Sequence, residues 1–372
     1  AYMGAVVSIG DMKDVIPFFQ PGAAMEYGLS TAIKKLSVVN KPAVAIIQGH
    51  GEPPLYELSQ VYNELKILYS VSTYTLTDTA EIPSEYRTIA IIRPNDTIPP
   101  SHLAKLDNFL ARGGNIFIAL NRVEGDFQTA TGRSLYTGLE DWLMKKGLTI
   151  SDNFVIDANC GSVNVQQQQG NFIMSTQVSF PYLPVITRFA DNPATKGLES
   201  VILQFASPIT FSGDSTKKFT PVAFTSEKSG TERAPLYFDI QRQWSERDFP
   251  LSGLAVAGIL EGRLSGNTDS KIMLVSDGDF AITGSQRGVQ LPKDNINLVV
   301  NSVDWLSDDT GLIDLRTKEV TSRPVRELSE GTRSLLKWLN FLLPIILVII
   351  YGLFRMQVNR NKRIKRMEVS YE

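Results

Sequence analysis

Short, largely apolar runs alternate with amphipathic segments in the first third of the chain. Residues 43–48, 88–92 and 115–120 form such runs, which are typical of strands covered on both faces in a parallel sheet. Between them, apolar residues recur at helical spacing over residues 55–69 and again from Ser101 onward. Strands that alternate with helices in this way predict βαβ units, and therefore an α/β fold with a doubly wound, mostly parallel sheet.

The hydrophobic pattern changes after residue 158. A helix is expected over residues 135–147, closed by a glycine. Residues 159–250 are then rich in β-branched and polar residues and are interrupted by proline and glycine, which indicates a β-rich insertion or second lobe. The alternation returns with an apolar run at 271–275 and a helical pattern at 293–307.

The longest apolar stretch of the sequence lies near the C-terminus. Residues 338–354 contain no charged side chain, and two leucines just upstream extend the stretch to begin at residue 335. About 20 helical residues span roughly 30 Å, the thickness of a hydrocarbon core. We therefore expect a transmembrane helix over residues 335–354. A buried core helix is the alternative, although a basic run follows the stretch directly.

Aromatic residues and a proline suit the expected membrane anchor. Trp338 and Tyr351 stand near the two ends, where amphipathic rings favour the headgroup interface. Pro344 lies inside the stretch, and membrane helices tolerate proline better than soluble helices do. Phe354 is the last apolar residue before the basic tail.

Charge is distributed unevenly along the chain. The tail after residue 354 has two acidic and six basic residues, a net charge of +4; because the whole chain carries −2, residues 1–354 carry −6. Basic residues beyond a span favour the cytoplasmic side of the membrane, where they contact anionic lipid. RNA binding by the tail is a weaker alternative, so we expect no nucleic-acid partner. The basic residues are Arg355, Arg360, Lys362, Arg363, Lys365 and Arg366.

These patterns predict a large domain outside the cytoplasm, held by one C-terminal transmembrane helix whose basic tail lies in the cytoplasm. The expected segments are residues 1–40 (an N-terminal segment, the remnant of a longer chain), 41–158 (first part of the α/β domain), 159–250 (β-rich insertion or second lobe), 251–314 (last part of the α/β domain), 315–334 (linker), 335–354 (transmembrane helix) and 355–372 (basic tail).

Two polar loops are the candidate ligand-binding sites. Gly49, His50, Gly51 and Glu52 follow the first predicted strand, at the edge of an open α/β sheet where ligands bind. A histidine beside a carboxylate suits acid–base chemistry, but the two glycines also suit a tight structural turn.

The second loop follows the apolar run at 271–275. Asp277 and Asp279 stand there on either side of a glycine. Two carboxylates after a strand are one way to hold a divalent cation. The same residue types are also ordinary in turns, so both interpretations stay open, and no metal or other cofactor is assigned.

Several enzyme classes lack their residues in this sequence. Cys160 is the single cysteine, which excludes an intramolecular disulfide framework and a multi-cysteine zinc site. The chain has two histidines, which excludes a histidine-rich metal site and an HExxH protease. Neither a Walker motif nor a nucleophile elbow is present. A thiol nucleophile activated by His50 remains a remote alternative, but the residues after Cys160 are a poor start for the helix that would lower its pKa. We expect no catalytic residue.

Several motifs resemble the GldG-type auxiliary components of ABC transporters. The resemblance is spread over nearly the whole chain and rests on the order and spacing of the motifs. They are residues 25–36 (MEYGLSTAIKKL), 41–52 (KPAVAIIQGHGE), 192–199 (NPATKGLE), 271–280 (KIMLVSDGDF), 297–306 followed by 311–313 (GLI), and 338–340 (WLN) with Pro344.

This resemblance implies a membrane-anchored extracytoplasmic subunit that accompanies an ABC permease and an ATPase, and that is associated with gliding motility in Bacteroidota. It thereby implies a bacterial inner-membrane protein with its main domain in the periplasm and its tail in the cytoplasm. It also implies a core similar to class I glutamine-amidotransferase-like domains without the catalytic cysteine. Residues 114–125 indeed contain no cysteine. The expected function is a non-catalytic transporter subunit. The alternatives are an extracytoplasmic solute- or glycan-binding module and, remotely, a cysteine-dependent amidotransferase or hydrolase.

Overall fold

The computed structural model describes residues 4–16, 29, 32, 33, 36, 41–169, 172–283, 290–307 and 330–368. The chain divides into two units, Ala1–Ser322 and Arg323–Glu372. We call the first unit the body and the second the C-terminal helix, and we describe each by itself. Most of the sequence motif at 25–36 lies outside the described residues, and the Gly311–Ile313 motif lies wholly outside them.

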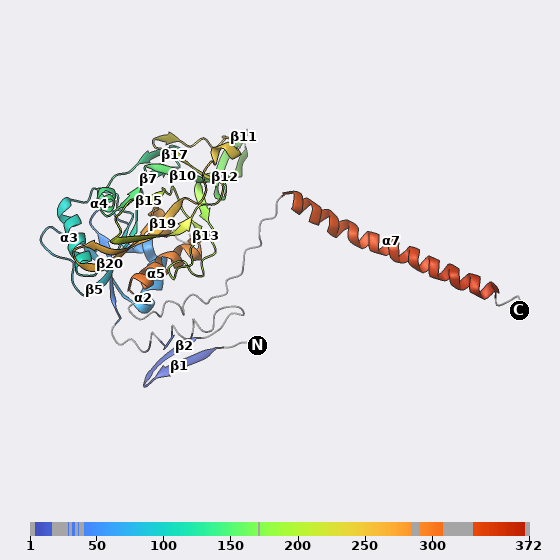
Figure 1. Cartoon of the computed structure of the whole chain (residues 1–372), viewed down its shortest axis with the longest axis horizontal. Helices are drawn as coiled ribbons and strands as arrows, with labels where there is room; N and C mark the ends of the chain where they lie inside the picture. The colour runs from blue at the N-terminus through green and yellow to red at the C-terminus, as the bar shows by residue number, and fades with distance from the viewer. Residues whose placement is uncertain are drawn as a thin grey trace. The chain divides into compact units, whose positions relative to one another are not determined.

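An eight-stranded sheet forms the centre of the body (Figure 1). Its strand order is β13-β16-β19-β20-β6-β5-β3-β4, in which the strands from β20 to β4 are parallel and the three at the other end pair antiparallel. The strands are β3 (Ala43–Gln48), β4 (Ser70–Thr75), β5 (Tyr86–Ile92), β6 (Asn115–Ala119), β13 (Arg188–Phe189), β16 (Lys217–Phe224), β19 (Ala255–Ser265) and β20 (Thr268–Val275).

Helices cover both faces of the sheet because its strands are apolar on both sides. Helices α2 (Ser59–Leu68) and α5 (Lys293–Ser307) pack on the face that includes Val44 and Ile46. Helices α3 (Pro100–Ala111) and α4 (Leu139–Lys145) pack on the opposite face, with Ala45 and Ile47. Successive residues of β3 therefore enter two different cores, as the period of two in a strand requires. The mixed α/β fold predicted from the sequence is confirmed.

The chain reverses its direction across the sheet between β3 and β5. From β3 it passes through η1 (Leu55–Leu58) and α2 to β4 on one side. It then returns to β5 on the other side of β3, and α3 leads on to β6. Such a switch point leaves a crevice at the carboxyl ends of the parallel strands, which is where the loops after β3 and β5 lie.

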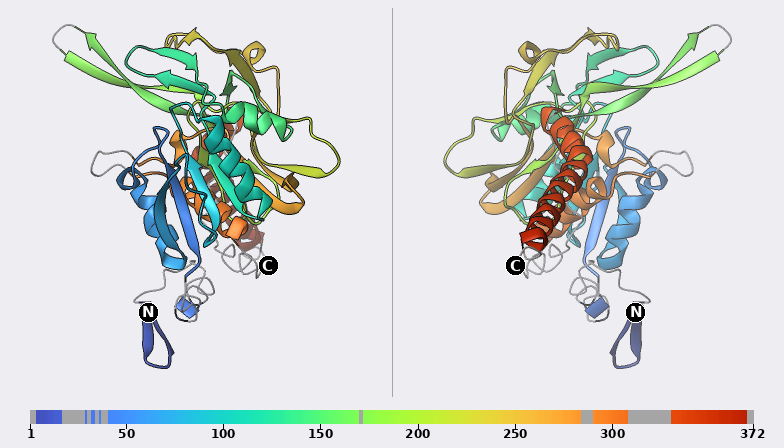
Figure 2. Two further views of the ribbon diagram at one scale, coloured as in Figure 1. Left: turned by 90° about the vertical axis from the view of Figure 1, so that its left-hand side faces the viewer. Right: turned by 90° about the vertical axis from the view of Figure 1, so that its right-hand side faces the viewer.

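A group of short β elements with an aromatic core lies beside the sheet. Phe154, Phe180, Tyr182, Phe205 and Phe238 are buried together there. The long β11–β12 hairpin extends from this region (green in Figure 2). The remaining elements are β1 (Ala5–Ile9), β2 (Met12–Ile16), β7 (Val123–Asp126), β8 (Thr131–Ser134), β9 (Leu148–Ile150), β10 (Asn153–Asp157), β11 (Cys160–Gln169), β12 (Phe172–Ile186), β14 (Val201–Ile202), β15 (Ile209–Phe211), β17 (Ser229–Arg233), β18 (Leu236–Tyr237), η2 (Glu246–Asp248) and η3 (Asp279–Ala281).

One expectation about local structure needs correction. The helix expected over residues 135–147 begins only at Leu139, because the β7–β8 hairpin occupies the preceding segment and the Leu135 amide donates to the Arg122 carbonyl at 2.9 Å. The stretch 159–250 stays predicted to be a β-rich insertion or second lobe, but two of its strands, β13 and β16, belong to the main sheet. The seven segment boundaries otherwise stay predictions.

The C-terminal helix, α7 (Glu330–Glu368), contains the apolar stretch that is expected to span a membrane. Within it, residues 334–364 are long and apolar enough to cross a membrane, and none of that stretch is buried against protein. The helix continues without a break through Pro344 and past Phe354. It also begins inside the segment expected to be a linker, at 315–334. The side chains of Lys365 and Arg366 lie outside the described part of the chain. The other aromatic and basic residues singled out in the sequence are exposed: Trp338, Tyr351, Phe354, Arg355, Arg360, Lys362 and Arg363.

Candidate functional site

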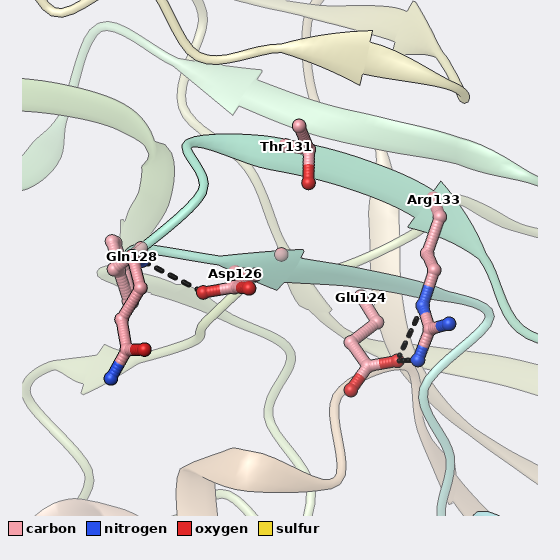
Figure 3. Close-up of a pocket in the computed structure, with 7 residues that line it drawn as sticks. Glu124, Asp126, Gln128, Thr131 and Arg133 are labelled. Atoms are coloured by element: carbon pink, nitrogen blue, oxygen red, sulfur yellow. Dashed lines mark hydrogen bonds and ion pairs between the residues drawn. The ribbon is translucent and has the colours of Figure 1, made fainter.

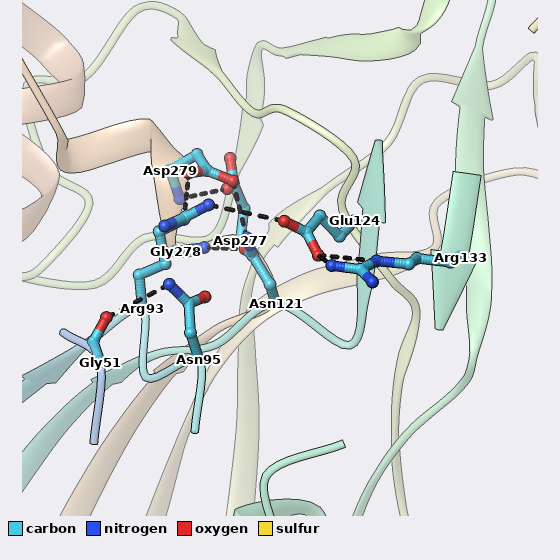
Figure 4. A network of polar contacts seen from close by, with 9 residues as sticks. All are labelled: Gly51, Arg93, Asn95, Asn121, Glu124, Arg133, Asp277, Gly278 and Asp279. Carbon is cyan, nitrogen blue, oxygen red and sulfur yellow. Dashed lines mark hydrogen bonds and ion pairs between the residues drawn. The ribbon is translucent and has the colours of Figure 1, made fainter. Parts of the chain in front are cut away.

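Loops from four parallel strands meet at the carboxyl edge of the sheet (Figure 4). They follow β3, β5, β6 and β20, and they bring together residues that are far apart in the sequence. The β5 loop lies between the two loops singled out in the sequence: the Asn95 amide donates to the His50 carbonyl at 2.9 Å, and the Asn95 side chain donates to the Gly51 carbonyl at 3.2 Å.

The loop after β3 folds back on itself around Glu52. The His50 amide donates to Glu52 Oε2 at 2.6 Å, and His50 Nδ1 lies 3.3 Å from Glu52 Oε1. Both residues are more than nine-tenths buried. Gly51 has φ +75°, and a Cβ there would meet the Asp96 carboxylate at 3.0 Å, so the turn needs glycine. His50 and Glu52 therefore form a buried polar cluster, whereas Gly49 and Gly51 are exposed at the same turn. Ligand binding by this loop stays a prediction.

A second histidine that the sequence analysis did not single out completes this cluster. His102, in α3, places Nδ1 2.8 Å from His50 Nε2. Its other nitrogen, Nε2, is 3.4 Å from Asp78 Oδ1. A carboxylate therefore stands at each end of the imidazole pair. Burial and the neighbouring His50 lower the pKa of His102 below its usual 6.5.

The aspartates after β20 are held by protein groups. Asp277 Oδ2 accepts the Gln204 amide at 2.5 Å, and Oδ1 accepts the Asp279 amide at 2.7 Å. The Asn121 side chain donates to Asp279 Oδ2 at 2.6 Å and accepts the Gly278 amide at 2.5 Å. Burial raises the pKa of both aspartates, and the charge of Asp279 adds to the effect on Asp277.

Arg93, from the β5 loop, balances this pair of acids. Its Nε lies 2.5 Å from Asp279 Oδ1. Arg93 has φ +50°, an uncommon conformation for a residue with a side chain, and a Cβ on Gly278 would lie only 2.7 Å from Arg93 Cβ. Among the described residues, no group of three or more histidine, cysteine or acidic side chains could hold a metal ion.

A polar pocket of about 640 Å³ lies along the β7–β8 hairpin (Figure 3). Glu124 links it to the sheet edge: one carboxylate oxygen is 2.9 Å from an Arg133 nitrogen, and the other is 3.8 Å from Arg93. The sequence analysis missed this pocket because neither the hairpin nor its charges formed a recognisable motif. It is lined by Glu124, Gly125, Asp126, Phe127, Gln128, Thr131 and Arg133.

The family model described as "ABC-type uncharacterized transport system" matches residues 41–306. The chain belongs to this family of ABC transport system components. The match includes the loops at the sheet edge, the pocket and the aromatic core, and it ends before the C-terminal helix. A comparison with curated proteins gave no match.

Several solved structures are similar to the body of this ABC transport component. The mmIFT52 N-terminal domain is 11% identical over 72% of this chain and 98% of its own, with a TM-score of 0.48. A ThuA-like protein from Parabacteroides merdae is 12% identical over 78% and 95%, with a TM-score of 0.39. The mannosidase Op5Man5 from Opitutaceae bacterium strain TAV5 is 12% identical over 76% and 39%, with a TM-score of 0.34. At these scores the likenesses carry no functional argument.

Cys160 does not have the surroundings of a nucleophile in this family member. It begins strand β11, where it pairs with Pro184 in the β11–β12 hairpin. Burial raises the pKa of its thiol, which disfavours the reactive thiolate. The residues after it form a strand, so no helix N-terminus follows to lower that pKa.

Proposed function

We propose that this chain is a non-catalytic, membrane-anchored subunit of an ABC transport complex, with its body in the bacterial periplasm. The observation that carries the proposal is the family match over residues 41–306 together with the apolar helix that follows it. The chain has no ATP-binding motif, so the proposed partners are a permease that spans the membrane and a cytoplasmic ATPase. The proposed process is gliding motility.

The charge on the C-terminal helix supports the proposed orientation. Arg355, Arg360, Lys362 and Arg363 are exposed on α7 directly after its apolar stretch. Basic side chains beside a span favour the cytoplasmic leaflet, where anionic lipids add to the attraction. The proposal therefore places the tail in the cytoplasm, against anionic lipid, and the body on the other side of the inner membrane.

The chemistry of the body supports a role without catalysis. Glu52, Asp277 and Asp279 at the sheet edge are each engaged by another protein group, and Cys160 is a half-buried thiol with a raised pKa. The proposal includes a core related to class I glutamine-amidotransferase-like domains that lacks the nucleophile, in agreement with the absence of cysteine from residues 114–125.

Purification from native membranes tests the complex. The full chain, tagged at the C-terminus and solubilised in mild detergent, should bring down one polytopic permease and one ATPase, identified by mass spectrometry. The control is the same body fused to an unrelated single-span anchor, which distinguishes contacts made by the body from contacts made by α7. Repeated recovery of the chain alone from its native membrane would reject the proposed complex.

Gliding needs a separate test because the complex does not depend on it. Deleting the gene should abolish spreading of the source bacterium over agar, and the full-length gene should restore it. Normal spreading of the deletion strain removes gliding from the proposal and leaves the transport complex in place.

A solute- or glycan-binding module is the second candidate function. The pocket on the β7–β8 hairpin favours it, because a volume of about 640 Å³ is in the range of small-molecule sites. This role is compatible with transport, since a subunit of the complex could present the bound molecule to the permease.

A further inference from the structure

Phe127 is an apolar side chain held in an exposed position. Half of its surface is accessible to solvent. Its ring centroid is 5.3 Å from that of Phe205 and 5.8 Å from that of Phe180, both of which are buried in the aromatic core. The ring is therefore anchored on one side and open on the other. A ring fixed in this way loses little conformational freedom when a ligand packs on it.

The rest of the pocket is polar and offers both donors and acceptors (Figure 3). Glu124 and Asp126 accept hydrogen bonds, Arg133 donates, and Gln128 and Thr131 do both. Sugar hydroxyls also donate and accept, while the C–H faces of a pyranose ring pack on aromatic rings. An anchored phenyl ring beside such groups matches a carbohydrate better than an apolar molecule, which would cover these polar groups without making any hydrogen bond to them.

The charge of the pocket favours a neutral ligand. Hydrogen bonds from the Gln128 amide and from Thr129 lower the pKa of Asp126, so this group is a carboxylate at neutral pH. With Glu124 and one guanidinium, the lining carries a net charge of −1 at neutral pH. An anionic ligand would be repelled by this arrangement.

Unusual backbone conformations are concentrated around the pocket. Among the described residues, Arg93, Ala130 and Phe205 are the non-glycine residues with positive φ. Ala130 closes the hairpin turn, Arg93 faces Glu124 at 3.8 Å, and Phe205 packs so closely that a Cβ on Gly125 would meet its ring at 2.3 Å. Such conformations cost free energy and tend to gather at functional sites.

We propose that the pocket of the β7–β8 hairpin binds a neutral oligosaccharide, with Phe127 as the ring on which a sugar stacks. Glu124 and Arg133 bond the hydroxyls at one end, and Gln128 bonds those at the other. This inference deepens the second candidate function and rests on the pocket alone, so failure of the proposed complex would leave it standing.

Isothermal titration of the full chain in lipid nanodiscs tests the proposal without a sugar-based detergent. The neutral probes are maltohexaose and the hexasaccharides derived from cellulose, laminarin, mannan, xylan and chitin. Oligogalacturonate serves as the anionic comparison. We expect at least one neutral probe to bind. Phe127→Ala should weaken that binding about tenfold or more, the loss of one stacking contact. Gln128→Ala should weaken it less.

Tyr56→Ala is the matched control, because Tyr56 is an exposed aromatic residue (66% accessible) outside the pocket lining. It should leave binding unchanged, and circular dichroism should show that all three variants are folded. Three results would overturn the proposal: no binding of any neutral probe, unchanged binding by Phe127→Ala, or a preference for oligogalacturonate. Failure to recover the permease and ATPase has no bearing on this experiment, so the two proposals can fail separately.

Discussion

His50 Nε2 and His102 Nδ1 lie 2.8 Å apart, and these two residues are the only histidines in the chain. At this distance one nitrogen donates a proton and the other accepts it, so both imidazoles cannot carry a proton on these facing atoms. Glu52 lies beside the outer nitrogen of His50, and Asp78 lies near the outer nitrogen of His102. The pair accommodates one positive charge between two carboxylates, and a second would force the rings apart.

This pair predicts a loss of stability in mild acid. The pKa of His102 is lowered in the folded chain by burial and by His50, so the unfolded chain binds more protons as the pH falls below about 6.5. The contribution of His102 to the free energy of unfolding is complete above pH 6.5. It is lost as the pH falls toward the lower pKa that His102 has in the folded chain. We expect the thermal midpoint, followed by circular dichroism, to fall between pH 7.5 and pH 5.5.

The variant His102→Gln separates this effect from other titrating groups. Asp277 and Asp279 have raised pKa values, which act in the opposite direction because the folded chain then binds more protons. Glutamine cannot titrate but still offers a donor and an acceptor. The thermal midpoint of the His102→Gln variant should therefore depend less on pH than that of the parent chain. Identical pH profiles of the two proteins would contradict this account.

Gly278 should not tolerate a side chain. A Cβ at this position would lie 2.7 Å from Arg93 Cβ and 2.9 Å from Arg93 Cα, and the backbone of Arg93 cannot move without disturbing its ion pair with Asp279. We expect Gly278→Ala to lower the free energy of unfolding by about 1–3 kcal/mol, as for other overpacked sites. Urea denaturation measures the change.

Gly161→Ala is the control for that substitution. The nearest atom to a Cβ at Gly161 is 3.6 Å away, an ordinary contact, so its effect should stay within about 0.5 kcal/mol. If both alanine variants are equally stable, the close approach of the β5 and β20 loops is not a constraint on the fold.

The proposed orientation can be tested with single cysteines. On a Cys160→Ser background, Ser84→Cys places a thiol on the exposed surface of the body, and Asn361→Cys places one on the exposed tail helix. A membrane-impermeant maleimide added to intact spheroplasts should label the first position, and the second only after lysis. Labelling of residue 361 in intact spheroplasts would reverse the proposed topology.

A charge in the middle of the apolar stretch should weaken the anchor. Ile346 is half-exposed on α7, and the apolar stretch around it is not buried against other protein residues. An arginine near the centre of a spanning helix costs about 2.5–3.5 kcal/mol of insertion free energy. Ile346→Arg should therefore increase the fraction released by alkaline carbonate, whereas Ile346→Ala should remain in the membrane pellet. Equal retention of both would argue against a single-span anchor.

Local patterns identified most elements of the sheet and helices. The apolar runs at 43–48 and 115–120 correspond to β3 and β6, and the helical pattern at 293–307 coincides with α5. These predictions succeeded because burial on one face or on both leaves a direct record in the spacing of apolar residues. The β7–β8 hairpin escaped prediction because its polar, exposed residues record no such burial.

The sequence by itself determined the α/β class, the position of the apolar helix and the separation of a basic tail from an acidic body, since these depend on periodicity, length and charge along the chain. Only the tertiary structure decided which polar residues meet. His50 and His102 are 52 positions apart, and Asn121 and Asp279 are 158 apart. Such contacts depend on the order of strands in the sheet, which follows from packing over the whole chain and leaves no local periodicity to detect.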